Sequence, residues 1–160
     1  MSSKILKDYE VISNYIVEII KAQDWTYDYD EDNECIYIEV AASSNEINIP
    51  LVMQVDKERE FFTVISALPI PIEEDKQDEM AIAVNIVNNI LVFGSFDYNY
   101  LECAISYRFT SSFRKSLISK SAYEFMIGIV LMSIETYLEN LTKLAFGEMT
   151  IEEFNAFVQG

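Results

Sequence analysis

The stretch that decides the fold runs from Ile47 to Leu68 and reads INIPLVMQVDKEREFFTVISAL. Its first part alternates apolar and other residues with a period of two, which predicts a β-strand with one buried face. Asp56 to Glu60 is a charged turn, and Phe61 to Leu68 predicts the returning strand of a β-hairpin. Because proline has no N–H to donate to a ladder, Pro50 predicts that the first strand lies at an edge or carries a bulge.

Helical and extended segments flank this hairpin on both sides. Apolar residues at steps of four and three predict an amphipathic helix over about Ser3 to Gln23, and Cys35 to Ala42 predicts a strand. The prolines of Leu68-Pro-Ile-Pro-Ile72 exclude a helix at that point. The acidic residues that follow favour a helix start, and we expect this helix to continue to about Phe93, with Gly94 as its stop.

The C-terminal part predicts a second hairpin and two more helices. The hairpin strands are Gly94 to Tyr98 and Leu101 to Phe109. Ser121 to Glu124 reads as a capping box that opens a helix to about Leu144, and Thr150 to Glu153 as one that opens a short terminal helix. Hairpins make antiparallel sheets, and alternating strands bury one face, so the expected fold is α+β: a two-layer sandwich with helices on one face of an antiparallel sheet.

We expect one domain over residues 1–160, because no Pro/Gly/Ser-rich linker divides the sequence. Within it we place an N-terminal helix over 1–23, a core over 25–146 and a C-terminal helix over 150–158.

The net charge is −16, from 27 acidic and 11 basic side chains. Such a surface repels phosphate backbones and anionic membranes, so we expect neither nucleic acid nor membrane as a partner. Cationic partners or metal ions are the electrostatically natural ligands, although net charge also simply keeps a domain in solution.

The sequence contains no histidine, which removes Ser-His-Asp and Cys-His catalysis and His-ligated zinc. Cys35 and Cys103 lie far apart in no CxxC pattern, which favours a reducing compartment. Acidic residues within the first 22 positions do not fit a secretory signal. We therefore expect a cytoplasmic protein with no catalytic residues, no cofactor and no metal site.

The acidic run from Asp28 to Glu34 is the sharpest local signal. Three of its aspartates and one later glutamate match positions one, three, five and twelve of a calcium-binding loop: Asp28, Asp30, Asp32 and Glu39. Asn33 stands where such a loop has glycine, and Cys35 to Val40 reads as a strand and not as the exiting helix. We expect a solvated acidic turn, with a calcium- or metal-responsive domain as the alternative.

Three asparagines and a basic segment each allow two interpretations. Asn85, Asn88 and Asn89 interrupt an apolar helix, and they either bond the backbone of a neighbouring strand or form an exposed polar face. Cys103 to Tyr123 contains four basic residues and no acidic ones; the basic residues are Arg108, Arg114, Lys115 and Lys120. This charge reversal either docks an acidic surface of a second subunit or is a loop with scattered bases, which we favour.

Phe125 to Ile134 is apolar around the whole helix circumference, unlike the single stripe of a surface helix. A second subunit is the obvious cover for its outer side, although the first or last helix of the same chain could serve.

These features together resemble the YbjN family of small bacterial proteins, from about Trp25 to the terminal helix. The resemblance is carried by Trp25-Thr-Tyr, Leu68-Pro-Ile-Pro, Asn85-Ile-Val-Asn-Asn89, Gly94-Ser-Phe96 and Tyr107-Arg-Phe109. It implies a fold similar to type III secretion chaperones and a homodimer. Members are described mostly as candidate sensory transduction regulators, and the family supplies no catalytic residues.

The function expected from the sequence is a cytoplasmic, homodimeric, non-enzymatic protein-binding module, chaperone-like or regulatory, with an unidentified and cationic protein partner. The alternative is the acidic calcium- or metal-responsive domain named above. An enzyme ranks third, because no spacing selects a set of catalytic carboxylates, tyrosines or cysteines.

Overall fold

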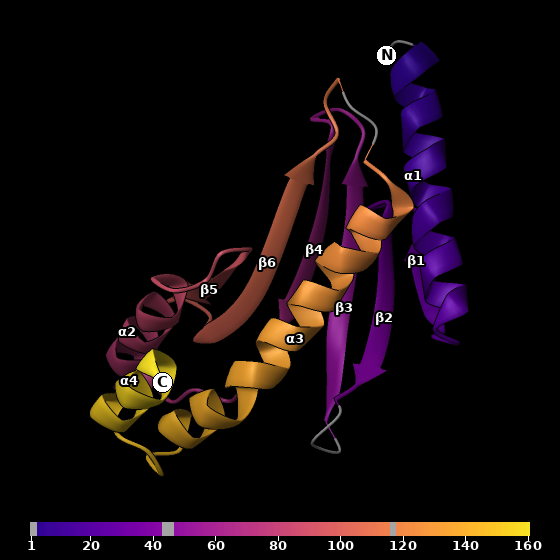
Figure 1. Cartoon of the computed structure of the whole chain (residues 1–160). Helices are drawn as coiled ribbons and strands as arrows, with labels where there is room; N and C mark the ends of the chain where they lie inside the picture. Colours follow the sequence, from indigo (N-terminus) through magenta and orange to yellow (C-terminus); the bar gives the residue numbers. More distant parts are fainter. Residues whose placement is uncertain (1–2, 43–46, 116–117) are drawn as a thin grey trace.

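The computed structural model describes residues 3–42, 47–115 and 118–160, with side chains from Tyr9 onward (Figure 1). The elements in chain order are α1 (Ser3–Ala22), β1 (Tyr27–Asp30), β2 (Cys35–Ala41), β3 (Asn48–Asp56), β4 (Phe61–Ala67), a 3₁₀ turn (Glu74–Lys76), α2 (Gln77–Asn88), β5 (Ser95–Asn99), β6 (Ala104–Ser112), α3 (Lys120–Ala145) and α4 (Ile151–Gln159).

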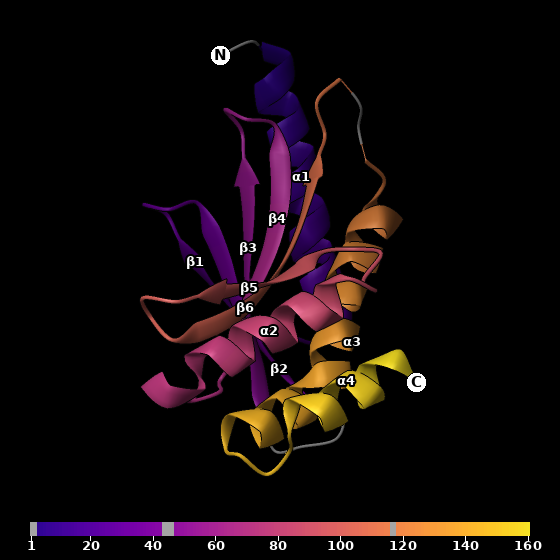
Figure 2. The same cartoon turned by 90° about the vertical axis from the view of Figure 1, so that its left-hand side faces the viewer.

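The strands form one six-stranded sheet in the order β1-β2-β3-β4-β6-β5, with every neighbouring pair antiparallel. α1 and α3 lie across one face of the sheet, and α2 and α4 pack together at its β5 end (Figures 1 and 2). This arrangement confirms the predicted α+β fold. The two sheet edges are β1, beside α1, and β5, beside α2.

The core lies between the sheet and the helices, and alternation in the strands builds it. In β3 the residues facing the helices are buried and their neighbours are half-buried, as the period of two predicts. α1 contributes an isoleucine stripe, and α3 contributes the side of the Phe125–Ile134 segment that faces the sheet. The largest fully buried side chains are Tyr107, Tyr123, Phe62, Phe96 and Phe154.

The prediction that β3 lies at an edge or carries a bulge at Pro50 was wrong, because β3 runs between β2 and β4 and its register with β2 is unbroken through Pro50. Pro50 pairs with Glu39 of β2, but the ladder with β4 extends only from Val52↔Ile65 to Asp56↔Phe61. Pro50 therefore lies beyond the end of the β4 ladder, where no N–H is needed.

Two helix ends also differ from the sequence expectation. α3 begins at Lys120 after the N-cap residue Ser119, so Ser121 opens no capping box and its hydroxyl instead bonds that of Ser119 at 3.0 Å. α2 ends at Asn88, well short of Phe93. The second capping box is confirmed: the Glu153 N–H donates to Thr150 Oγ1 at 3.2 Å, and the Thr150 N–H donates to Glu153 Oε2 at 2.9 Å.

Within the part of the chain that the structure describes, no helix has the length and apolar character needed to cross a bilayer.

Candidate functional site

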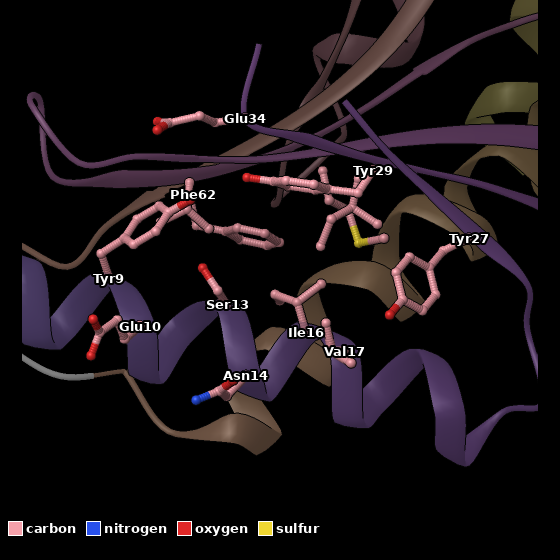
Figure 3. Close-up of a pocket in the computed structure, with 13 residues that line it drawn as sticks. Tyr9, Glu10, Ser13, Asn14, Ile16, Val17, Tyr27, Tyr29, Glu34 and Phe62 are labelled. Atoms are coloured by element: carbon pink, nitrogen blue, oxygen red, sulfur yellow. The ribbon is translucent and has the colours of Figure 1, made fainter. Parts of the chain in front are cut away.

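A groove of about 590 Å³ opens between α1 and the β1 side of the sheet (Figure 3). Ile16, Met53 and Phe62 form its apolar floor and are almost completely buried. The remaining lining residues come from α1, β1 and their neighbours: Tyr9, Glu10, Ser13, Asn14, Val17, Tyr27, Tyr29, Glu34, Ile36 and Val55. This volume is in the range of ligand-binding clefts in proteins.

Tyrosines from two elements form the groove walls. Tyr27 and Tyr29 alternate along β1 and face the helix side of the sheet, because they pair with the inward residues Ile38 and Ile36. Both remain partly open to solvent, at 39% and 48% exposure. Tyr9 reaches the groove from α1, and Ser13 points its hydroxyl from α1 into the groove (Figure 3).

A polar contact closes one end of the groove. Tyr29 hydrogen bonds with Tyr9; this bond, with partial burial and the nearby carboxylates of Glu34 and Glu31, raises the pKa of Tyr29 to about 12. Lys57 pairs with Glu34 and also lies 5.1 Å from the centre of the Tyr9 ring. Tyr29 is therefore a neutral phenol at neutral pH, and it offers both apolar surface and a hydrogen-bonding hydroxyl.

Negative charge gathers beside this groove, in the turn between β1 and β2. Within the described residues, ion pairs engage Glu34 of the acidic run but not Asp28, Glu31 or Asp32. Asp30 accepts from the N–H of Asp32 at 2.9 Å and from the Asn33 amide at 2.8 Å. The bonds from Asn33 hold the pKa of Asp30 below its usual value. The predicted solvated acidic turn is confirmed, and it leaves a field that favours a cationic ligand.

The residues of the calcium alternative do not converge. Asp28 and Glu39 line a shallow depression of about 470 Å³ on the open face of the sheet, whereas Asp30 holds the turn together. Glu39 accepts from Asn48 Nδ2 at 3.3 Å. Across residues 3–42, 47–115 and 118–160, no group of three or more His, Cys, Asp or Glu side chains is placed to hold a metal ion.

One of the three asparagines bonds a strand, and the other two face solvent. Asn88 Nδ2 donates to the Phe96 carbonyl at 2.8 Å, and the Phe96 N–H donates to Asn88 Oδ1 at 2.9 Å. Asn85 and Asn89 are exposed. Since β5 is an edge strand, Asn88 satisfies backbone groups on its unpaired side, as a neighbouring strand would.

The favoured interpretation of the basic segment, a loop with scattered bases, is right only for Arg114 and Lys115, because Arg108 lies in β6 and Lys120 begins α3. Arg108 pairs with Asp97 at 2.9 Å, Arg114 with Glu60 at 3.4 Å and Lys120 with Glu18 at 2.9 Å. These bases therefore tie elements of the same chain together.

The Cys35 thiol is not arranged as a nucleophile. Burial, with the carboxylates of Asp30 and Glu34, raises the pKa of the Cys35 thiol. A neutral buried thiol is unreactive. Cys103 is half-buried and accepts from the side-chain amide of Gln77 at 2.8 Å.

Comparison with solved structures identifies the fold. YbjN of E. coli, a candidate transcription regulator, matches with a TM-score of 0.58 over 82% of this chain and 90% of its own, at 5% identity. A chain of the HopA1–SchA chaperone–effector complex matches with a TM-score of 0.53 over 82% of this chain and 93% of its own, at 9% identity. This is the fold of YbjN and of the type III secretion chaperone SchA.

The resemblance stated from the sequence is thereby confirmed for the fold. No protein-family model matches the sequence, and no curated protein matches it. At such low identities, the shared fold does not by itself transfer a function.

Sequence reasoning missed the groove. Tyr27-Asp-Tyr-Asp30 has the period of a strand with tyrosines on one side and aspartates on the other. Its aspartates were instead interpreted as part of the acidic turn. That alternation was the one signal of a strand with an aromatic inner face. Its meeting with Tyr9 depends on how α1 packs.

Proposed function

We propose that this chain is a non-enzymatic protein-binding module, chaperone-like or regulatory, which acts in the cytoplasm as a homodimer. The observation that carries the proposal is the tyrosine-walled groove beside an acidic turn. It offers an apolar floor, phenolic hydroxyls in its walls and, in the turn that follows β1, the carboxylates of Glu31 and Asp32, which no ion pair within the described residues engages.

The chemistry of the groove favours a segment of a protein partner that carries an aromatic or long aliphatic side chain next to Lys or Arg. The apolar side chain would fill the space above Ile16, Met53 and Phe62. Tyrosine faces attract cations, and opposite charge speeds association and fixes orientation. Tyrosine is also enriched among residues that dominate binding energy.

The comparisons support the same reading at a coarser level. One similar fold comes from a chaperone–effector complex, and the other is a candidate transcription regulator. Both are proteins that act through binding, and the open groove here gives this chain a surface with which to do the same.

A groove-filling variant tests the proposal. Ser13→Trp introduces bulk from α1 into the groove without changing charge (Figure 3). Asn85→Trp, at an exposed position on α2, is the matched control. Each protein would be immobilised at equal density and exposed to a bacterial lysate, and captured proteins would be identified by mass spectrometry.

We expect the wild type and Asn85→Trp to capture the same partner in equal amounts. Ser13→Trp should capture at least ten-fold less of that partner, and its melting temperature should show that it is folded. If folded Ser13→Trp captures the partner as well as the wild type does, the groove is not the binding site.

A further inference from the structure

The face of the sheet that α1 and α3 leave uncovered has the depression of about 470 Å³ over β1, β2 and β3. Its lining includes Asp28 of β1, Tyr37 and Glu39 of β2, and Val52 of β3. In β2 and β3 these residues alternate with buried ones that face the helices, so their side chains lie on the uncovered face. This depression is separate from the groove, which opens on the helix side of the sheet.

The strand pairing brings two carboxylates to one aromatic ring. Asp28 lies opposite Tyr37, and Glu39 lies two residues further along β2 on the same face. Such diagonal neighbours on a sheet face are about 7–8 Å apart at Cα. Val52 lies opposite Tyr37 on the other side, and the Tyr37 side chain is 40% exposed. The depression therefore combines an accessible phenol ring, two carboxylates and an apolar neighbour.

The chain does not supply a cation for these carboxylates. Among the residues that the structure describes, ion pairs engage neither Asp28 nor Glu39. Glu39 accepts a hydrogen bond only from a neutral group among those described, the Asn48 side-chain amide at 3.3 Å. Arg108 lies on the same face of the sheet, but it is on β6, two strands beyond β3, and it pairs with Asp97. A cation between Asp28 and Glu39 would relieve their mutual repulsion.

We propose that this depression binds the guanidinium group of an arginine residue in a protein partner; the proposal rests on the protein-binding role of the proposed function and names a residue of the partner. A guanidinium is planar and carries five N–H donors, so it donates to Asp28 and Glu39 together while its face lies on the Tyr37 ring. Its alkyl stem packs against Val52. We call these four residues the arginine site.

Charge and shape select this occupant. The ammonium group of lysine offers neither a planar fork to two carboxylates nor a flat face to a ring. A metal ion is a poorer fit, because across residues 3–42, 47–115 and 118–160 no three His, Cys, Asp or Glu side chains are grouped to hold one. A shallow depression encloses little of a free small molecule, whereas ligand pockets bury most of their ligand. The guanidinium is therefore best held as part of a larger protein partner.

NMR titration with short blocked peptides at physiological ionic strength tests the site. We expect a Gly-Arg-Gly peptide to shift the amide signals of Tyr37 and Glu39 saturably. The citrulline peptide, which has nearly the same shape without the charge, should give no saturable shift, and the lysine peptide should bind about three-fold or more weakly. Equal binding of the citrulline or lysine peptide overturns the guanidinium assignment. Butylguanidinium that binds more tightly than the arginine peptide overturns the assignment to a residue of a protein.

Variants locate the binding on the protein. Asp28→Asn and Glu39→Gln should each weaken the arginine peptide about ten-fold, because one of two charge-assisted hydrogen bonds becomes neutral. Glu31→Gln is the matched control, because it removes the same charge from an exposed position in the turn between β1 and β2. It should change the affinity by less than about two-fold, since exposed charges are screened by salt. If Glu31→Gln weakens binding as much as Glu39→Gln does, the peptide follows the general negative field and the arginine site is overturned.

Ser13→Trp separates this site from the groove. Because Ser13 lines the groove on the helix side of the sheet, this variant should bind the arginine peptide as the wild type does. Loss of the peptide by folded Ser13→Trp would place the peptide in the groove and overturn the arginine site. A wild type that binds no arginine peptide overturns the arginine site alone, because capture of a partner through the groove is measured separately.

Discussion

Asn88 holds the free edge of β5 through two hydrogen bonds to the backbone of Phe96, at 2.8 and 2.9 Å. Asn88→Ala removes both and leaves a partly buried N–H and carbonyl without partners. Each bond contributes about 1 kcal/mol net, and an unsatisfied buried group costs about 1–3 kcal/mol, so we expect a loss of about 2–3 kcal/mol. For a chain of this size that corresponds to a fall in melting temperature of about 5–10 °C.

Asn88→Asp keeps one of the two hydrogen bonds and makes the loss of the other depend on pH. The carboxylate still accepts from the Phe96 N–H, but it places negative charge against the Phe96 carbonyl. Its pKa in the folded state should therefore lie above its unfolded value of about 3.9. A raised carboxyl pKa means that folding favours the protonated form, so the variant's deficit relative to wild type is full above the folded pKa and shrinks as pH falls toward the unfolded one.

The assay is urea unfolding of wild type, Asn88→Ala and Asn88→Asp at several pH values. Asn85→Ala and Asn85→Asp on the same helix are matched controls, because Asn85 is exposed. The controls should change the free energy of unfolding by less than about 0.5 kcal/mol. If Asn88→Ala behaves like Asn85→Ala, the edge bonds do not stabilise the fold and the reasoning fails.

Three further perturbations follow from the structure. Gly94→Ala should cost about 2–4 kcal/mol in urea unfolding, because Gly94 has φ +64° and a Cβ would lie 2.9 Å from the Arg108 carbonyl oxygen; a neutral result would mean that this segment relaxes freely. Tyr29 should titrate near pH 12 by NMR, since its bond with Tyr9 favours the protonated phenol, and Tyr9→Phe should lower that pKa. The corresponding contribution to stability is present below about pH 10 and is lost as pH rises toward 12. An ordinary pKa for Tyr29 would show that the bond with Tyr9 does not form. Finally, the melting temperature should rise between about 0.01 M and 0.15 M sodium chloride, as the Debye length falls from about 30 to about 8 Å and screens repulsion among the acids; a flat or falling response would show that they are locally compensated.

The hairpin from Ile47 to Leu68 was predictable because its strands bury one face, so alternation survives in the sequence. β1 was not, because Tyr27–Asp30 is short, half acidic and stabilised by pairing with β2. The end of α2 was missed for a related reason. The apolar residues after Asn88 extend the helical pattern, but Phe93 packs on Phe109 and Phe125, and Asn88 bonds the strand that follows.

The groove lay beyond sequence reasoning because Tyr9 and Tyr29 are far apart along the chain and meet only when α1 packs against the sheet. Similarly, the apolar character of Phe125 to Ile134 predicted an uncovered side, but only the structure shows that Phe125 and Met132 form it. In both cases the residue types were visible in the sequence, and their neighbours were set by packing between distant elements.

The most direct test of the central claim, that the groove beside β1 holds a protein partner, is photo-crosslinking from inside it. A photoreactive side chain at Ser13 lies within the groove, and one at Asn85 serves as the control (Figure 3). We expect a crosslink from Ser13 alone, to a partner peptide with an aromatic or long aliphatic residue beside Lys or Arg. Equal crosslinking from both positions, or an acidic peptide at Ser13, would contradict the account.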